Sequence, residues 1–443
     1  MNTPICDFVK KYAEKSHLRL HMPGHKGQGF LGVEKFDITE VDGADVLYRC
    51  DGIISESQQN AAKIFGTNKT LYSTEGSSLS IRAMLYLACI FAKEQGRPLK
   101  IAAGRNAHKV FLTASALLDF EIDWLYGDSL LSYRLSAEDL EKYLSEVTER
   151  PAAVYITSPD YLGCVTDIKA LSAVCKKYDV LLICDNAHGA YLKFLENDRH
   201  PITLGADMCC DSAHKTLPVL TGGGYLHISN SAPKTLSLQA EEAMQLFAST
   251  SPSYLILQSL DYNNSYIADG YCKKLNEFVR AVEGLKAELT DNGFTLVGDE
   301  PLKLTIATKG YGYHGFAVAA DLQKKGIVCE FCDPDFVCFM LTPENGAQSV
   351  RYLQKALCEL EKKTAIAEEA PTVTKAQRCC SPRQALMCAS EIVPIDECEG
   401  RVMASVSVSC PPAIPIAVCG EMIDRNAIDR MKYYGITEVR VTK

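Results

Sequence analysis

The sequence lacks an apolar run long enough to cross a membrane. Its longest such run, AMLYLACIFA at residues 83–92, is far shorter than the roughly 20 residues that a membrane-spanning helix needs. The first fifteen residues, MNTPICDFVKKYAEK, contain no apolar core of signal-peptide length. We therefore expect a cytoplasmic protein with no membrane partner.

The sequence also lacks a basic excess, internal repeats and low-complexity segments. Its 46 Lys and Arg against 55 Asp and Glu give a formal net charge of −9, which disfavours nucleic acid as a partner because no surplus of cations exists to neutralise phosphates. An acidic balance suits solubility and weakly attracts cationic small molecules. With 443 residues, 47% of them hydrophobic, we expect a globular protein of two or three domains.

Cysteine is abundant, at 19 residues, and several cysteines lie in apolar, strand-like runs where a reduced thiol acts as a small buried hydrophobe. A CxxC spacing occurs once, at Cys329 and Cys332, with no second pair and no nearby His. The pair is either a metal or redox site or two cysteines at the end of a strand. We favour the second interpretation and expect no metal.

Short apolar runs alternate with helix-like segments from residue 55 onward. The runs KIAAG, VYITS, VLLICD, MCCDSA and GGYLHIS predict a mostly parallel sheet covered by helices on both faces. Later runs, LKLTIAT, IVCEFCD and FVCFMLT, predict strands of a smaller α+β domain. The expected parts are an N-terminal arm at 1–54, a large domain at 55–252, a small domain at 253–363, a linker at 364–377 and a compact C-terminal domain at 378–443.

A lysine that could form a Schiff base stands in DSAHKTLPVLTGGG, residues 211–224. Lys215 follows an apolar strand, and ligands of doubly wound sheets collect at strand ends, where a nucleophilic lysine is held rigidly and partly desolvated. By itself, this pattern favours an ordinary surface lysine.

An aspartate ends an apolar strand in LLICDNAHGAY, residues 181–191. Burying Asp185 is costly unless its carboxylate meets a cation. The protonated ring nitrogen of pyridoxal phosphate (PLP) is such a cation, and its proton lets the ring accept electrons from a substrate. The alternatives are a helix N-cap for Asp185 and a structural hydrogen bond for His188.

Two further segments could bind the rest of such a cofactor. In STEGSSLSIRAML, residues 73–85, Ser77 and Ser78 open a long helix whose N–H groups suit a phosphate, although plain capping also explains them. In AGRNAHKVF, residues 103–111, His108 could lie flat on an aromatic ring or be a loop histidine. Phosphate site, stacking histidine, aspartate and lysine follow one another in the order that fold-type I PLP enzymes use.

The chain also resembles a family, the Orn/Lys/Arg decarboxylases of bacteria in their shorter form, over nearly its whole length. The similar segments are LHMPGHKGQGF, DITEVDGADVLY, RNAHK, DNAHGAY, SAHK, STSPSYLILQSLD and CPPAIPIAVCGE. The resemblance implies a fold-type I PLP-dependent transferase-like α/β fold with PLP as cofactor. It also implies α-decarboxylation of lysine, arginine or ornithine to a diamine or polyamine precursor, and active sites shared across a homodimer.

The resemblance further implies a role for individual residues. Lys215 is the Schiff-base lysine and His214 its neighbour at the cofactor, Asp185 pairs with the ring nitrogen, and His108 stacks on the ring. The other implied contacts are Ala187 and His188 at the ring, Ser77, Ser78 and Ser212 at the phosphate, and Thr250 or Ser251 at the phosphate of the partner subunit.

Departures from the family pattern concentrate at the substrate end. Asn186, Ala413, Cys419 and Tyr48 stand where the family usually has Glu, Gly, Pro and His. They leave the cofactor residues intact and put the choice of substrate in doubt.

A buried substrate cation needs a carboxylate partner. The candidates are Glu421 first, then Asp45, and Asp42. The sequence does not choose among the three basic amino acids, because these are distinguished by pocket shape.

Two other functions stay open. One is an aminotransferase or lyase of the same fold, but aminotransferases usually grip the substrate carboxylate with a bidentate small-domain Arg. No Arg occurs between Arg280 and Arg351, and Arg351 falls in a helix-like segment, which favours decarboxylation. The other is a catalytically idle PLP-binding protein, although an idle site has no need of Lys215 and Asp185.

Overall fold

The computed structural model describes residues 1–15, 17–127, 134–372, 374–410 and 414–443. The chain divides into two compact units, each built from two segments. The first unit contains Met1–Gly96 and Ile168–Lys274, and the second contains Arg97–Asp167 and Leu275–Lys443.

The first unit holds four strands in the order β1-β7-β6-β5. Strands β5 and β6 run parallel, whereas β7 is antiparallel to both β6 and β1. Strand β5 is buried along its whole length, as expected of an apolar run covered on both faces. The strands are Lys69–Ser73 (β1), Leu181–Asp185 (β5), Met208–Asp211 (β6) and Gly224–Ile228 (β7).

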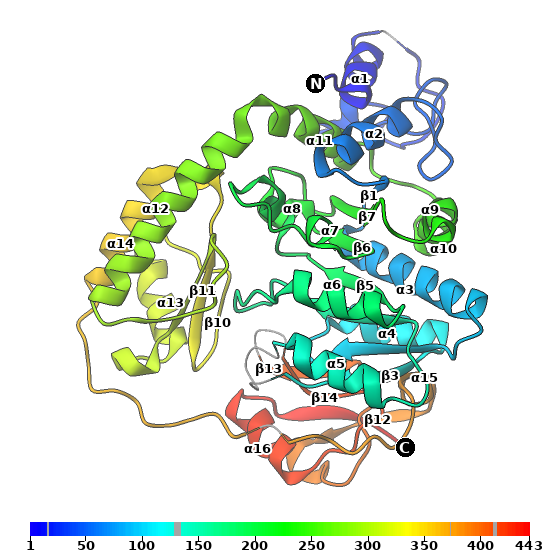
Figure 1. Ribbon diagram of the computed structural model, residues 1–443. Coiled ribbons are helices and arrows are strands. Elements are labelled where there is room, and N and C mark those ends of the chain that lie inside the picture. Colours follow the sequence, from blue (N-terminus) through cyan, green and yellow to red (C-terminus); the bar gives the residue numbers. More distant parts are fainter. Residues whose placement is uncertain (16, 128–133, 373, 411–413) are drawn as a thin grey trace. The chain divides into compact units, whose positions relative to one another are not determined.

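Helix α3, Gly76–Glu94, contacts β7 and β6 and is the longest helix lying wholly within the described part of the first unit (Figure 1). Its first turn therefore lies next to the strands that carry the candidate cofactor residues. The other helices of this unit are α1 (Pro4–Glu14), α2 (Ile53–Phe65), α6 (Ile168–Lys177), α7 (Pro201–Leu204), α8 (Ala213–Thr216), α9 (Lys234–Leu238), α10 (Ala240–Phe247) and α11 (Tyr254–Tyr266), with short helical segments at Glu34–Phe36, Ala190–Phe194 and Ile267–Tyr271.

The second unit begins with three strands in the order β4-β2-β3, all parallel. Strand β2, Lys100–Gly104, is the central one and is followed directly by the RNAHK motif. The other elements of this part are β3 (Glu121–Leu125), β4 (Ala153–Thr157), α4 (Lys109–Leu118) and α5 (Ala137–Glu146).

A second sheet in this unit is antiparallel, in the order β10-β11-β9-β8. Helices α12 and α14 lie side by side near it, joined by a hydrogen bond from Gln354 to Glu288 (Figure 1). The elements are β8 (Thr295–Val297), β9 (Lys303–Ala307), β10 (Phe331–Cys332), β11 (Phe336–Met340), α12 (Cys272–Asp291), α13 (Gly315–Lys324) and α14 (Gly346–Cys358), with 3-10 turns at Lys309–Tyr311 and Pro343–Asn345.

The C-terminal residues form two antiparallel strand pairs, β12 with β15 and β13 with β14. A compact apolar core, which includes Met403, Ile423 and Ile428, lies between these strands and helix α16. The elements are α15 (Pro382–Met387), β12 (Ser390–Pro394), the 3-10 turn Ile395–Glu397, β13 (Ser407–Cys410), β14 (Ile414–Val418), α16 (Arg425–Tyr433) and β15 (Glu438–Thr442).

The α/β alternation expected from the sequence is confirmed, with some corrections. Of IVCEFCD, only Phe331–Cys332 is a strand, because the preceding segment leaves β11 and exposes Val328, so context overrides strand propensity. Of RVMASVSVSC, only the last four residues are a strand. Arg351 lies on helix α14, as predicted. The linear domain boundaries remain a prediction.

No helix in the described ranges is both long and apolar enough to span a membrane.

Candidate active site

Lys215 lies in the short helix α8, directly after strand β6. Its Nζ atom is 3.1 Å from Nε2 of His188, which is buried and follows strand β5. The backbone N–H of Lys215 donates to the carbonyl of Ser212 and fixes the turn. The structure therefore brings two candidate cofactor residues together from neighbouring strand ends.

Asp185 ends strand β5 and is buried, with 2% of its surface exposed. Its Oδ1 accepts the N–H of Ala187 at 3.2 Å and lies 3.5 Å from the Sγ atom of Cys210. The next helical segment, Ala190–Phe194, has Gly189 at its N-cap. Asp185 is thus not an N-cap and lies at the strand edge that also carries Lys215.

A buried hydrogen-bond network around Asp211, at the end of strand β6, was missed by sequence reasoning. The Oδ2 atom of Asp211 lies 3.1 Å from Nε2 of both His200 and His227, and Oδ1 accepts the side-chain N–H of Asn186 at 2.7 Å. Burial alone would raise the pKa of Asp211, but the two histidines hold it well below its usual range. Burial also lowers the pKa of His227. An ionised Asp211 therefore fixes Asn186, which explains one departure from the family pattern.

The signal for this network was available in part. Asp211 stands at the end of the same apolar run as the SAHK motif, and an aspartate in that place needs buried donors. Its partners His200 and His227 lie eleven and sixteen residues away in sequence, with no spacing that marks them.

Three buried ligand atoms from His200, Cys209 and Asp211 lie within 4.8 Å of one another, close enough to share a metal ion. The Asp211 carboxylate there already accepts hydrogen bonds from Asn186, His200, His227 and the Cys209 thiol. Burial, together with the charge of Asp211, raises the pKa of the Cys209 thiol well above its usual range, so the thiolate that metal binding requires is disfavoured. The group is a hydrogen-bonded core cluster.

The start of helix α3 provides donors suited to a phosphate. The hydroxyl of Ser212 donates to that of Ser77 at 2.9 Å, and the N-cap residue Glu75 makes no side-chain capping bond. Ser77 and Ser78 lie in the first turn of the helix and not at its N-cap, and the hydroxyls of Ser77 and Ser212 lie together there. N–H groups and hydroxyls at a helix start suit a phosphate. This donor set fits the phosphate of PLP.

Glycines let the backbone approach this helix start closely. A Cβ on Gly224 would lie 2.8 Å from the carbonyl of Asp211 and 3.3 Å from the nitrogen of Ser77. Gly222 has a φ of +98°, and its carbonyl accepts the N–H of Gly76. The run of three glycines after Lys215 therefore brings strand β7 against the first turn of α3.

His214 and His108 occupy different surroundings. Nδ1 of His214 lies 2.8 Å from the carbonyl of Gly223, and burial lowers the pKa of its imidazole. His108, in the second unit, is the N-cap of α4, and its Nδ1 accepts the N–H of Val110. Its imidazole is exposed.

Two residues implied at a partner subunit, Thr250 and Ser251, lie exposed in the loop before α11.

The residues that depart from the family pattern have varied surroundings. Tyr48 is buried, with its hydroxyl donating to the carbonyl of Tyr72. Cys419 is a buried thiol whose pKa burial raises to about 12. Ala413 lies outside the described residues.

Two of the three acids expected at the substrate, Glu421 and Asp45, form hydrogen bonds within the fold. Both carboxylate oxygens of Glu421 accept from Arg105 at 2.7 Å, and the pair is buried. Oδ2 of Asp45 accepts N–H groups at the start of α2, from Gly52 and Ile54. Asp42 is exposed. A substrate cation would have to share or replace the partners of Glu421.

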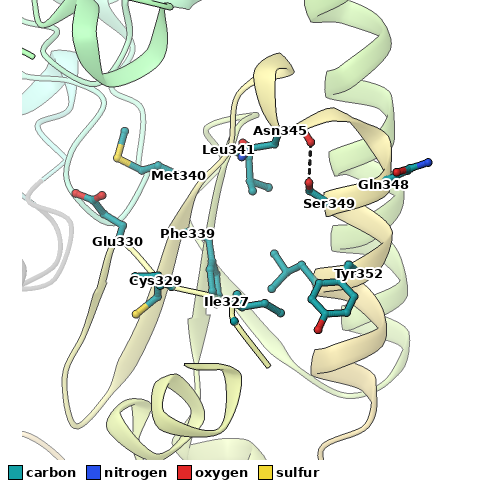
Figure 2. Close-up of a pocket in the computed structure, with 13 residues that line it drawn as sticks. Ile327, Cys329, Glu330, Phe339, Met340, Leu341, Asn345, Gln348, Ser349 and Tyr352 are labelled. Atoms are coloured by element: carbon teal, nitrogen blue, oxygen red, sulfur yellow. Dashed lines mark hydrogen bonds between the residues drawn. The ribbon is translucent and has the colours of Figure 1, made fainter. Parts of the chain in front are cut away.

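The second unit has a cavity of about 530 Å³ between the segment after α13, strand β11 and helix α14 (Figure 2). Cys329 and Glu330 line it together with Phe339 and Tyr352. Burial raises the pKa of the Cys332 thiol, and the neighbouring Cys329 raises it further. None of the expected cofactor residues is among the residues that line this cavity.

The fold is that of the fold-type I PLP enzymes. Among solved structures, the constitutive lysine decarboxylase of Escherichia coli matches with a TM-score of 0.79 at 18% identity, covering 100% of this chain and 82% of that chain.

The family follows from the sequence. The chain matches the major domain of the Orn/Lys/Arg decarboxylases over residues 3–296 and their C-terminal domain over 361–440, and it belongs to this family. An arginine decarboxylase of Bacillus subtilis is 28% identical over 96% of this chain and 92% of its own length. An arginine decarboxylase of Halalkalibacterium halodurans is 29% identical over 95% of this chain and 91% of its own length.

Proposed function

We propose that this protein is a PLP-dependent decarboxylase that releases the α-carboxylate of a basic amino acid as CO2. The observation that carries the proposal is the meeting of Lys215 and His188 at a strand edge that also bears the buried Asp185. PLP, when bound, supplies an electron sink for the bond that breaks at the substrate Cα. The family membership supports the same reaction.

In this proposal, the chain's own residues bind and orient the cofactor. Lys215 holds it covalently, and Asp185 keeps a proton on the ring nitrogen, because a buried carboxylate favours a neighbouring cation. His108 covers the ring, with His214, Ala187 and His188 around it. Ser77, Ser78 and Ser212 bind the phosphate through their hydroxyls and the start of α3.

Decarboxylation is favoured over transamination by the small domain. Strands β8, β9, β10 and β11 contain no arginine, and Arg351 lies on helix α14. A bidentate arginine clamp would hold the substrate carboxylate firmly, whereas a decarboxylase must let it leave. The absence of such an arginine from these strands supports loss of CO2.

Arginine is the first substrate to test, since the relatives from Bacillus subtilis and Halalkalibacterium halodurans carry the name arginine decarboxylase. The product would be an amine of the kind that polyamine synthesis uses. We propose that the side-chain cation of the substrate is met by an acid of the N-terminal arm or of the C-terminal box, the segment CPPAIPIAVCGE at residues 410–421. Of the three candidates, Asp42 is exposed. Asp45 and Glu421 accept hydrogen bonds from other residues of the chain.

We also propose a homodimer of cytoplasmic location. The N-terminal arm exposes the large apolar side chains of Leu18, Leu20 and Phe30, and exposed apolar surface favours contact with another protein surface. A second copy of the chain would cover them. Many of the cysteines whose side chains the structure describes are buried, and buried thiols of this kind suit a reducing compartment.

The test uses the purified protein with PLP and each of arginine, lysine and ornithine, with measurement of CO2 and of the amine. Lys215→Ala is the control for background release. We expect stoichiometric CO2 and amine from one of the three. A cofactor-loaded protein that consumes none of them would overturn the decarboxylase, and release of a keto acid without CO2 would identify a transaminase.

A further inference from the structure

Arg105 and Glu421 form a buried, two-pronged ion pair within the second unit. Nη1 of Arg105 donates to Oε1 and Nη2 to Oε2, each at 2.7 Å, and the two residues are only 2% and 3% exposed. Parallel N–H···O bonds between charged groups are among the stronger hydrogen bonds in proteins and fix the geometry of both groups.

Neighbouring contacts hold each half of the pair in place. Oε2 of Glu421 also accepts the backbone N–H of Val418 at 3.0 Å, at the end of β14. The guanidinium of Arg105 lies over the ring of Trp124, 4.9 Å from its centroid, and its backbone N–H donates to the carbonyl of Leu125. The pair therefore links the C-terminal box to the ends of β2 and β3.

Arg105 belongs to the turn that carries His108. The N–H of Ala107 donates to the carbonyl of Gly104, and the N–H of Phe111 donates to the carbonyl of His108. Arg105 is buried at one end of this turn while His108 is exposed at the other. A shift of the Arg105 side chain would move the backbone that sets the place of His108.

We infer that Glu421 is a positioning residue, which holds the turn 104–108 through Arg105 and so presents His108 to the cofactor. This inference rests on the proposed function, because that function places His108 on the cofactor ring. It gives Glu421 a role other than binding the substrate cation. Removing the carboxylate would leave a buried guanidinium without its counter-charge, which is strongly unfavourable and would loosen the turn.

The experiment measures PLP affinity without substrate, by titrating the cofactor-free protein and following the absorbance of the bound cofactor. The variants are Glu421→Gln, His108→Ala and the two combined. We expect each single change to weaken PLP binding about tenfold and the double change to do little more, because residues that act through one contact are not additive.

Ile428→Ala is the matched control, since it opens the core of the C-terminal domain without touching Arg105. It should lower the melting temperature and leave PLP affinity unchanged. If Glu421→Gln does not fold, Arg105→Gln with Glu421→Gln, which leaves no unpaired buried charge, replaces it in the same cycle and should also weaken PLP binding.

Three results would overturn the inference: additive losses from Glu421→Gln and His108→Ala, unchanged PLP affinity in Glu421→Gln, or a raised KM for the basic amino acid as its sole effect. The last would make Glu421 a substrate contact. A wild-type protein that binds no PLP would instead overturn the proposed function, so the two failures are distinguishable.

Discussion

The Nζ atom of Lys215 lies 3.1 Å from Nε2 of His188. The two residues are 27 positions apart in sequence, and they meet because β5 and β6 are adjacent parallel strands whose carboxyl ends share one edge. Ligands of α/β sheets bind at such edges. The contact places the proposed cofactor lysine in the same small region as Asp185.

The first prediction concerns the lysine itself. The purified protein should be yellow, and borohydride should remove the visible band while fixing the cofactor to Lys215, since reduction makes the linkage permanent. Peptide mapping by mass spectrometry locates the adduct. Lys215→Ala should lose the band yet keep weak PLP binding through the phosphate contacts. An adduct on another lysine would refute the assignment.

The second prediction tests the buried carboxylate of Asp185. Asp185→Asn should keep the fold and much of the PLP binding but slow turnover by several orders of magnitude, because the ring nitrogen loses the counter-charge that keeps it protonated. The measurement is kcat with the best substrate.

Asp207→Asn is the matched control for Asp185→Asn. Its Oδ2 accepts the N–H of Leu182 at the opposite, amino end of the same strands. It should leave kcat nearly unchanged. Near-normal turnover in Asp185→Asn would reduce Asp185 to a structural residue.

The third prediction concerns the shared site. Mixing inactive Lys215→Ala subunits with inactive Thr250→Ala/Ser251→Ala subunits should restore part of the activity, because each heterodimer would contain one intact composite site. Activity after subunit exchange is the readout, with exchange followed by a size or charge tag. No recovery despite exchange would argue for sites contained within one subunit.

The fourth prediction concerns the stability that Asp211 supplies. Because His200 and His227 depress its pKa, this stability is present above the unfolded pKa of about 4 and is lost as pH falls below it. Asp211→Asn should therefore cost about 2–4 kcal/mol at pH 7, measured by urea denaturation. The difference from wild type should hold at pH 5 and shrink toward pH 3. An equal cost at every pH would mean that charge plays no part.

The fifth prediction concerns Asp333, whose contribution to stability falls as pH rises, the opposite of Asp211. Burial raises the pKa of Asp333 to about 7. Its Oδ1 accepts the N–H groups of Asp335 and Phe336, while Oδ2 meets no hydrogen-bond partner in the described part of the chain. Stability from this protonated carboxyl is fully present below about pH 4 and is lost as pH rises through 7.

Asp333→Asn keeps the acceptor and removes the titration. It should therefore match wild type near pH 4 and be more stable by up to about 4 kcal/mol at pH 8. Urea denaturation at the two values checks this. A variant less stable than wild type at pH 8 would show that the pKa of Asp333 is not raised in the folded protein.

The sequence by itself determined the strands that carry the proposed cofactor residues. Strands β5 and β6 are short apolar runs that end in Asp185 and Asp211, and Lys215 follows the second. A buried strand requires such a run, and a reactive group must stand at its end to be reached. Motif order along the chain therefore predicted the class and the family, which the comparisons confirmed.

Tertiary structure alone decided what the carboxylates do. Glu421 meets Arg105 across 316 residues of sequence, and Asp45 accepts N–H groups at the start of α2, so both carboxylates have partners within the fold that no sequence pattern indicated. Asp211 gains two histidines whose spacing carries no motif. A buried charge takes whichever partner the packing brings near, and packing depends on contacts distant in sequence, which no local pattern records.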